Sequence, residues 1–417
     1  MHRSNSLEKN ILRNLRRNFE YGVLGERSIA ARGCGRSLLR MRSAGLNMVQ
    51  VKKQNRSSIL NCIMQKGPMS RKDIAEITGL TPAAVTLICS ELIQQGLLQE
   101  MGIDTFSTGA GRKKVLVDVN YNCYYVMTIN IESDNTFLAV SNMKGECLDK
   151  ETIVTDRNVE PEVFLADIVK LCRRIWDRSQ LGTKLTGVSV TVPGVVDRER
   201  GISVHAYGVW KRQVAVCEIL KEELGLPIWL ENNVNAFAVA ELLYGLGREY
   251  DNLLIIKWGP GVGSTIVIDG QVYKGRHGKA AELGHFIIER NGVVCNCGRR
   301  GCLETKVSYR ALSGIVPFAV EEFGEVYRRA AAEGKDGIFQ EAIDLFARTV
   351  VNSMTILAPN RVVLFGSLFR DKIIRDRLIE ACEMYDPRYG AGRIIYSTLA
   401  ERENYIGPVA VFVQSIL

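Results

Sequence analysis

Four residues between positions 285 and 302 have the types and the spacing of a metal site. The pattern His-x9-Cys-x-Cys-x4-Cys is formed by His285, Cys295, Cys297 and Cys302. Zinc binds thiolate sulfur and imidazole nitrogen in a tetrahedron, and Gly298 and Gly301 let the backbone turn tightly enough for three sulfurs to converge. The other eight cysteines are scattered singly, as core cysteines usually are. Because four protein ligands leave no position for water, we expect a structural Zn²⁺ ion that takes no part in catalysis.

Two carboxylates flank this loop. Glu282 precedes His285 by three residues, and Glu304 follows the last cysteine by two. Alone, either glutamate is more typical of a solvated surface charge. Together, on one rigid loop, they can accept hydrogen bonds from neighbouring hydroxyls, and the second ring nitrogen of His285 can face another hydroxyl. The arrangement indicates a site for a sugar.

Composition restricts the class of protein. The chain has 417 residues, of which 46% are hydrophobic and 24% charged, as in soluble globular proteins of two or three domains. No apolar run approaches the ~18 residues that span a bilayer, and no signal peptide opens the chain. Free thiols in number fit a reducing compartment. We therefore expect a cytoplasmic protein with no membrane partner.

Most of the net charge lies at the N-terminus. Residues 1–50 contain nine Arg, one Lys and three Glu, and so hold +7 of the chain's net +8. Such a leader is typical of a nucleic-acid-binding arm or of an organelle transit segment. Since the recognisable domain begins after Met48, we expect residues 1–50 to be a disordered leader or the product of an upstream start codon, and assign them no function.

The segment 51–118 has the pattern of a winged helix-turn-helix. Helices are predicted at residues 57–65, 71–78 and 82–95. Ser70 and Thr81 are expected N-caps, Pro82 suits a first helical position, and Gly79 allows the turn between the last two helices. Two strands, 97–100 and 114–119, follow around a Gly-rich loop that resembles a wing.

This unit is expected to bind DNA, with its second motif helix in the major groove and its wing at the backbone or the minor groove. The candidate contacts are Arg71, Thr81, Ala83, Ala84, Thr86, Ser90, Arg112 and Lys113. The predicted recognition helix lacks Arg and Lys. A small helical interaction domain without DNA therefore stays an alternative.

Strands and helices alternate from residue 119 to the C-terminus. Strands are predicted at 125–131, 137–141, 186–192, 227–230, 253–257 and 264–268, and helices near 161–178, 214–224 and 234–246. The pattern predicts an α/β unit with two β-rich lobes.

From about Arg56 to the C-terminus, the chain resembles the ROK family of sugar kinases and sugar-responsive repressors. The resemblance depends on Glu-x-Gly-His at 282–285 with Cys-x-Cys-Gly-x-x-Gly-Cys at 295–302, and, for the repressor branch, on Ser-Arg-x-x-Ile-Ala, Thr-Gly-Leu-Thr and the wing motif Thr-Gly-x-Gly-Arg. It implies a two-lobed, actin-like ATPase (RNase H-like) fold. It also implies that Glu282, His285 and Glu304 contact the sugar, and that His285 and the three cysteines hold zinc.

The elements that a sugar kinase needs are degraded. Where kinases of the family have Asp-x-Gly-Gly-Thr, residues 130–136 read Asn-Ile-Glu-Ser-Asp-Asn-Thr, without the glycines that admit phosphate. Where they have a catalytic Asp, this chain has Asn233, whose amide cannot accept a proton. A general base is worth roughly 10² to 10⁴ in rate, so we expect binding without catalysis. Only Gly-Pro-Gly-Val-Gly at 259–263 remains of the phosphate loops, and it is also an ordinary tight turn.

We therefore predict a sugar-responsive transcriptional repressor, a homodimer or higher oligomer that binds a palindromic operator. The effector is a sugar or sugar phosphate. The expected sugar-binding residues are Asn232, Asn233, Glu282, His285 and Glu304. The turn at 192–194 and Trp210 are expected on the other side of the sugar, and the loop 195–212 to discriminate between sugars. Two alternatives are an ATP-dependent sugar kinase with a DNA-binding regulatory domain and a sensor whose partner is another protein.

Overall fold

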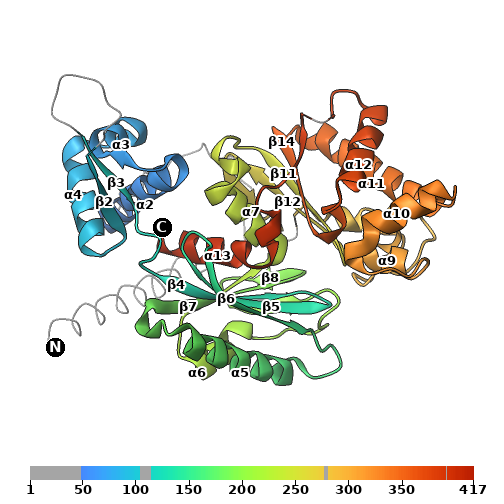
Figure 1. Cartoon of the computed structure of the whole chain (residues 1–417), viewed down its shortest axis with the longest axis horizontal. Coiled ribbons are helices and arrows are strands. Elements are labelled where there is room, and N and C mark those ends of the chain that lie inside the picture. Colours follow the sequence, from blue (N-terminus) through green and yellow to red (C-terminus); the bar gives the residue numbers. More distant parts are fainter. Residues whose placement is uncertain (1–47, 104–113, 277–279, 391) are drawn as a thin grey trace, which may run out of the picture. The chain divides into compact units, whose positions relative to one another are not determined.

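The computed structural model describes residues 48–103, 114–276, 280–390 and 392–417. The chain separates into two units, Met1–Val51 and Lys52–Leu417, and the fold described below lies almost entirely in the second (Figure 1). All but the end of the basic leader lies outside the described residues, and the boundaries of the predicted domains stay predictions.

A three-helix unit with a small sheet follows the leader. Its elements are α2 (Met48–Lys66), β1 (Met69–Ser70), α3 (Arg71–Thr78), α4 (Pro82–Gln94), β2 (Leu98–Ile103) and β3 (Val115–Val119). The sheet order is β1-β3-β2, and both pairs are antiparallel. The side chain of Ser70 accepts from the Asp73 N–H, and that of Thr81 from the Ala84 N–H, each at 3.3 Å. Gly79 has φ 69°, the left-handed conformation that ends α3. The predicted winged helix-turn-helix is confirmed. Helix α2 begins at Met48, well before the predicted residue 57. The prediction missed its first turns because their apolar residues have no regular spacing.

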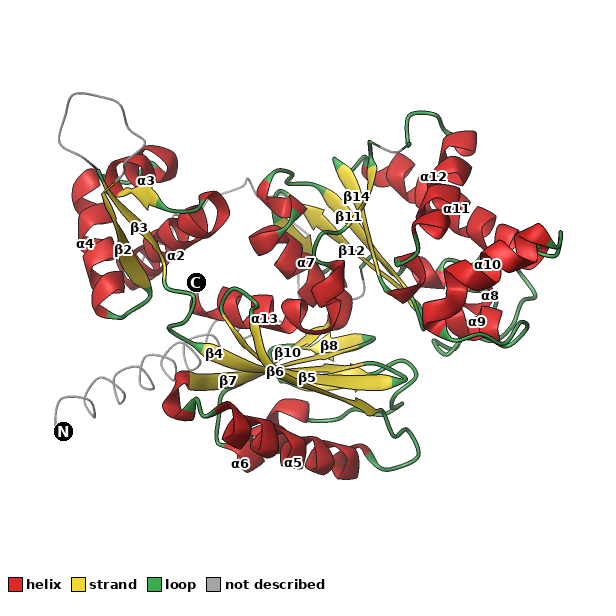
Figure 2. Ribbon diagram, in the orientation of Figure 1, coloured by secondary structure: helices red, strands yellow, loops and turns green. Residues whose placement is uncertain are grey.

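The first lobe is built on a five-stranded sheet of order β10-β7-β4-β5-β6. Its strands are β4 (Tyr125–Ile131), β5 (Asn135–Asn142), β6 (Cys147–Val154), β7 (Leu185–Val192) and β10 (Ile228–Asn232). Helices α5 (Pro161–Ser179) and α6 (Val216–Leu224) lie on one face, and α13 (Glu403–Ile416) lies on the other (Figure 2). A short hairpin, β8 (Val195–Asp197) with β9 (Ile202–His205), precedes α6.

The second lobe has another five-stranded sheet, of order β13-β12-β11-β14-β15. Its strands are β11 (Leu253–Trp258), β12 (Val262–Ile268), β13 (Gln271–Tyr273), β14 (Arg361–Phe365) and β15 (Ile394–Tyr396). Its helices are α8 (Glu304–Val307), α9 (Tyr309–Ser313), α10 (Phe323–Ala332), α11 (Gly337–Leu357) and α12 (Lys372–Tyr385). Trp258 is fully buried and stacks on Phe346 with ring centroids 4.7 Å apart. Helix α7 (Asn233–Tyr244) follows β10 and packs along α13.

The two sheets share one topology. In each, the first three strands form an antiparallel meander, and the last two are added in parallel beside the first strand. The predicted α/β class with two β-rich lobes is confirmed. Among the described residues, no single helix is long and apolar enough to cross a membrane; only α3 and α4 taken together pass by length and composition, and they are bent by 119° at their junction.

Candidate functional site

Residues of both lobes line one cavity of about 280 Å³. All five predicted sugar-binding residues are among its lining residues: Asn232, Asn233, Glu282, His285 and Glu304. Each stands at the end of an element. Asn232 ends β10 and Asn233 begins α7, Glu282 precedes a 3-10 turn that contains His285, and Glu304 begins α8. These ends of strands and helices converge in space, although Asn232 and Asn233 are far in sequence from the other three residues.

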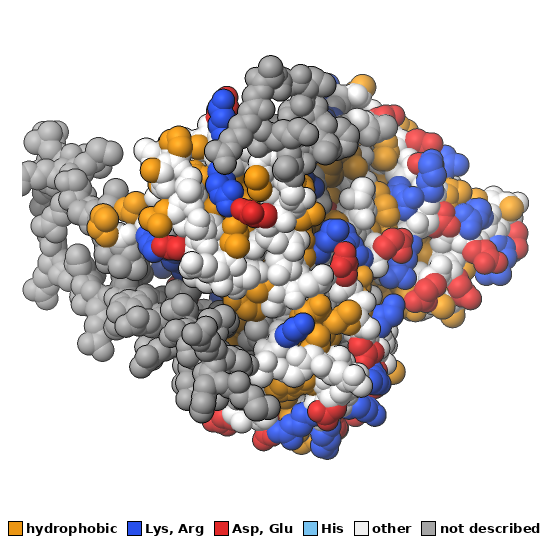
Figure 3. Space-filling model, turned by 60° about the vertical axis from the view of Figure 1, so that its left-hand side comes forward, with side chains coloured by type: hydrophobic (Ala, Val, Ile, Leu, Met, Phe, Trp, Pro, Cys, Tyr) orange, Lys and Arg blue, Asp and Glu red, His pale blue; other side chains and the backbone are white. Residues whose placement is uncertain are grey.

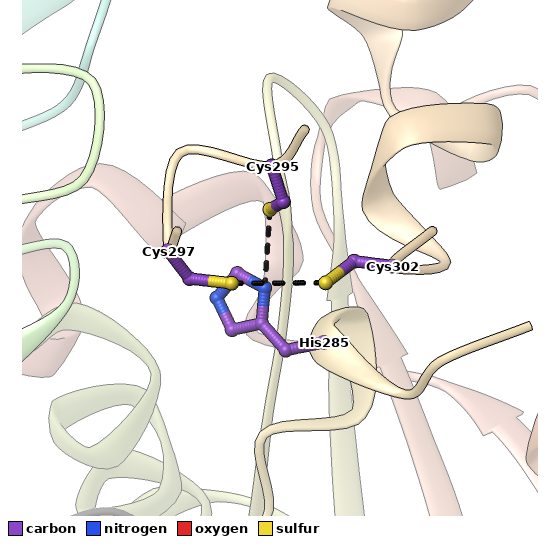
Figure 4. Close-up of side chains that lie close together, drawn as sticks. All are labelled: His285, Cys295, Cys297 and Cys302. Atoms are coloured by element: carbon purple, nitrogen blue, oxygen red, sulfur yellow. Dashed lines mark hydrogen bonds between the residues drawn. The ribbon is translucent and has the colours of Figure 1, made fainter. Parts of the chain in front are cut away.

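The four predicted metal ligands come together beside this cavity (Figure 4). Their ligand atoms all lie within 4.8 Å of one another. The Sγ of Cys295 is 3.5 Å from His285 Nδ1, and the Sγ atoms of Cys297 and Cys302 are 3.6 Å apart. In a tetrahedral zinc site with Zn–S bonds of about 2.3 Å, neighbouring sulfurs are roughly 3.8 Å apart. The donor types and their spacing therefore fit a zinc ion.

Two glycines shape the loop that carries the cysteines. Gly298 has φ 86° and Gly301 has φ 68°. A Cβ on Gly301 would lie 1.7 Å from the carbonyl oxygen of Glu289, so no other residue fits there without moving the backbone. Bridges Ile287–Cys302 and Val294–Arg300 close the loop as an irregular hairpin.

The protonation of His285 suits a metal ligand. Burial lowers the pKa of His285 to about 4, and the charge of Arg299 adds to this effect. The imidazole is therefore neutral near pH 7, as metal binding requires. Its Nδ1 faces the sulfurs, and its Nε2 lies 3.7 Å from Glu282 Oε2. The two ring nitrogens thus face the metal cluster and the carboxylate that lines the cavity.

Glu304 is fixed against the Gly-rich loop between β11 and β12. Its Oε2 accepts a hydrogen bond of 2.9 Å from the Val262 N–H, and burial raises its pKa. A Cβ on Gly261 would lie 2.7 Å from this oxygen. The glycine is therefore needed so that the carboxylate can approach the loop, and the Val262 N–H already has a partner.

The side-chain amides of Asn232 and Asn233 already form hydrogen bonds within the protein. Asn232 Oδ1 accepts from the N–H groups of Val234 and Asn235 and so caps α7, while its Nδ2 donates to the Gly194 carbonyl at 2.8 Å. Asn233 Nδ2 donates to Glu132 Oε1 at 2.8 Å. Asn232 therefore positions the end of β10, and one N–H of its amide is left for a ligand.

Sequence reasoning missed several lining residues. Glu132, at the end of β4, forms an ion pair with Lys257 of β11, and their side chains are only 14% and 15% exposed. Asp134, two residues on and outside the cavity lining, pairs with Arg310 of α9 at 3.1 Å, and Arg310 does line the cavity. The β4–β5 turn thus brings two carboxylates to two bases of the second lobe. The altered motif at 130–136 was the available signal, although only as the loss of glycines.

The aromatic residue in the cavity wall is not the predicted one. Trp210 is 6% exposed, donates from Nε1 to Ser203 Oγ at 3.0 Å, and packs in the core of the first lobe. Tyr207 lines the cavity instead, with its ring centroid 5.2 Å from that of His285 at 78°. Burial raises the pKa of Tyr207 to about 12, so its hydroxyl stays protonated. Pro193 and Gly194, from the predicted turn, do line the cavity.

The candidate DNA contacts separate into three groups. Thr81, Ala83, Thr86 and Ser90 are exposed on α4, and Ala84 is half-buried. Arg71 is engaged by Glu100 at 2.8 Å, which leaves it less available to phosphate. Arg112 and Lys113 lie outside the described residues. The prediction omitted Leu87, which is 61% exposed on α4.

Comparisons with known proteins cover both parts of the chain. A model of the ROK family matches residues 126–403, and a model of winged helix-turn-helix DNA-binding domains matches residues 53–99. The chain is 28% identical to a "putative xylose repressor" of Caldicellulosiruptor sp. (strain Rt8B.4), over 89% of this chain and 98% of that protein. It is 24% identical to the DNA-binding transcriptional repressor Mlc of Escherichia coli K12, over 81% and 84%.

Two solved structures extend these comparisons. A crystal structure of a ROK family transcriptional regulator, described as a homologue of E. coli Mlc, matches with TM-score 0.72 and 25% identity, over 88% of this chain and 96% of that one. A ROK hexokinase from Thermus thermophilus matches with TM-score 0.56 and 22% identity, over 69% and 97%. This second match shows a shared fold alone.

Proposed function

This chain belongs to the ROK family, and from that premise we propose that it is a sugar-responsive transcriptional regulator, a repressor of a carbohydrate-utilisation operon. The observation that carries the proposal is a combination. A winged helix-turn-helix precedes a cavity lined by Glu282, His285 and Glu304, and an internal ion pair between Glu132 and Lys257 forms at the β4–β5 turn, where the sequence lacks the glycines expected of a kinase. The relatives named above as repressors support it.

We propose that residues of the cavity wall hold the sugar. Glu282 and Glu304 are acceptors for neighbouring hydroxyls, His285 Nε2 faces the same space, and Tyr207 offers a protonated hydroxyl. A zinc ion at His285 and the three cysteines would hold this loop rigid, since it takes its ligands from both ends of the hairpin. A rigid site loses little conformational freedom on binding. The metal would supply no chemistry.

Two features argue against turnover. Asn233 cannot accept the proton of a hydroxyl, and its amide is bonded to Glu132. The carboxylates of Glu132 and Asp134 neutralise Lys257 and Arg310, the cations that would otherwise attract a triphosphate. A phosphate at the β4–β5 turn would therefore find no net positive charge. We infer a binding protein, with a sugar kinase as the alternative.

A dimer is the form in which we propose that the protein acts. Two recognition helices one turn of DNA apart match a palindromic operator. A regulator of this kind acts in the cytoplasm, where its operator is. Sugar bound between the lobes would favour one arrangement of them over another and so change the affinity for DNA.

The proposal is tested on the purified full chain. A panel of xylose, glucose, N-acetylhexosamines and their phosphates is screened by thermal shift, since a ligand at 100 times its Kd stabilises by about 2.7 kcal/mol. We expect one sugar class to raise the Tm, and Glu304→Gln to abolish the shift. The control Glu289→Gln, on the same hairpin but not in the cavity lining, should keep it.

The same panel is run with ATP and Mg²⁺ in a coupled assay of ADP release. A regulator shows no sugar-dependent ADP release at any position of the panel. Release at an enzymatic rate with any sugar would contradict the proposal and favour the kinase.

A further inference from the structure

One face of the recognition helix α4 is exposed and almost without charge. Ala83, Leu87, Ser90 and Gln94 follow one another at helical spacing, and Thr86 lies beside them. All five are exposed, whereas Val85, Ile88, Cys89 and Leu92 are buried on the opposite side. Leu87 lies near the middle of the exposed face, and 61% of it is open to solvent. A large apolar side chain at the centre of such a face can bury its surface only against a partner.

The hydroxyl groups on this face have already used their hydrogens. Thr86 Oγ1 donates to the Pro82 carbonyl at 2.8 Å, and Ser90 Oγ donates to the Thr86 carbonyl at 2.9 Å. At the start of the helix, Thr81 Oγ1 accepts from the Ala84 N–H. With these bonds in place, the first two turns of α4 offer base edges apolar surface, acceptor oxygens and the hydroxyl hydrogen of the N-cap Thr81, but no side-chain N–H donor.

Exposed cations of this unit stand on the neighbouring helices and not on this face. Among the residues of α4, Glu91 is the only charged one, and it pairs with Lys52 of α2 at 2.8 Å. Exposed lysines such as Lys53 and Lys72 stand on α2 and α3. In Figure 3, which turns the left side of Figure 1 forward, the surface between the grey atoms is mainly white and orange, with a few blue and red side chains. An uncharged helix face on a unit whose other helices carry exposed lysines fits a duplex whose phosphates border a groove.

We propose that α4 recognises thymine methyl groups in the major groove, with Leu87 and Ala83 as the specificity-determining residues. The proposal rests on the proposed DNA-binding function and names what that function recognises. In the major groove, thymine alone presents an apolar C5-methyl group, whereas guanine presents two acceptors that require donors. The first residues of a recognition helix contact base edges, and here Ala83 and Leu87 can bury a methyl but have no side-chain donor for guanine.

The test begins with selection of the operator from a random library of duplexes by the full-length protein. Each thymine of the enriched half-site is then replaced singly by deoxyuridine, which lacks only the methyl. We expect at least one replacement per half-site to weaken binding about fourfold, the factor that corresponds to one buried methyl-sized group. Where thymine is replaced by cytosine, 5-methylcytosine should recover part of the loss.

Variants assign the contact. In Leu87→Ala, the ratio of affinities for thymine and deoxyuridine at that position should fall to about one, with an unchanged Tm, since the side chain is exposed. Ile77→Ala is the matched control: Ile77 is an exposed apolar residue, 48% open, on α3, and its removal should leave the ratio unchanged.

Three results would overturn the inference. If a duplex is enriched but no deoxyuridine replacement changes its affinity, the protein binds DNA without the proposed methyl contact. A Leu87→Ala variant that keeps the thymine preference, or that changes only the oligomeric state, removes Leu87 from the DNA interface. If no duplex is enriched at all, the proposed function fails and this inference fails with it.

Discussion

At the scale of single residues, the side chain of His285 belongs to two neighbouring sites. His285 turns Nδ1 to three sulfurs and Nε2 to Glu282. One imidazole thus joins the proposed metal cluster to the proposed sugar site. Because the ring is neutral near pH 7, it can serve both without a charge to solvate.

A first prediction concerns this cluster. Cys302→Ser removes one proposed zinc ligand. Because Cys302 is fully buried, a water molecule has no room to take the place of its sulfur. We expect the wild type to hold about one zinc ion per chain by elemental analysis and the variant to lose it. If the wild type is saturated at 100 times its Kd, stability falls by about 2.7 kcal/mol or more. Sugar affinity should fall too, because Glu282 and Glu304 stand on the same hairpin.

Cys147→Ser is the control for that experiment. Cys147 is half-buried on β6, away from the cluster, and should keep both metal and stability within about 0.5 kcal/mol. Wild-type protein that contains no metal, or a Cys302→Ser variant that retains it, would contradict the assignment of these four ligands.

At the scale of elements, the turn between β4 and β5 connects the two lobes by charge. It carries Glu132 and Asp134 to Lys257 and Arg310, which belong to the second lobe. Each of these ion pairs therefore links the β4–β5 turn to the second lobe. At residues 130–136 the sequence has two acids and no glycine.

A second prediction follows for this turn. Glu132→Gln leaves the poorly exposed Lys257 ammonium without its main partner, so we expect unfolding free energy to fall by about 2–3 kcal/mol in urea. Adding Lys257→Met should recover part of this loss, because the double variant leaves no unpaired charge.

The exposed pair Lys306–Glu289, at 40% and 48% exposure, is the reference for that series. Removing it with Lys306→Met should change stability by no more than about 1 kcal/mol. If Glu132→Gln is as mild as this reference, or if the double variant is the less stable of the two, then the pair does not join the lobes as proposed.

At the scale of the whole molecule, a shared topology explains how two lobes form one site. In each sheet, parallel strands end at the edge that lines the cavity: β10 delivers Asn232 and β11 delivers Lys257. Helix α7 begins at the cavity with Asn233 and packs along α13. A change in the distance between the lobes would therefore move α7, which is how we expect sugar to affect DNA binding.

The third prediction measures this coupling. If the chain is a regulator, saturating sugar should change operator affinity by roughly 5- to 150-fold, equivalent to about 1–3 kcal/mol, and operator should change sugar affinity by the same factor. Titrations in both directions on the full chain check the reciprocity, and sedimentation of the free chain checks that it is a dimer. Equal sugar affinity with and without operator would remove the sugar from the regulatory scheme.

Much of the fold followed from the sequence because its signals are local. Buried strands such as β4, β7 and β11 are rich in Val, Ile and Leu, and the caps Ser70 and Thr81 mark helix starts within a few residues. No strand was predicted beyond Ile268. Strand β14, with the sequence Arg-Val-Val-Leu-Phe, is a short apolar run that periodicity cannot distinguish from helix, and β6 is an edge strand with neither face fully buried.

The site residues also fall into those that the sequence indicated and those that only the structure brought together. The metal ligands and two glutamates lie within 23 residues of one another, from 282 to 304, so their spacing alone indicated a site. Glu132, Tyr207, Lys257 and Arg310 are brought to it from four separate segments. Nothing in their neighbourhoods in the sequence marks them, because each is defined by its partner across the cavity. The sequence by itself determined the family, the fold class and the ligand-bearing hairpin. Only the tertiary structure decided which distant charges neutralise one another beside it, since pairing depends on distance in space.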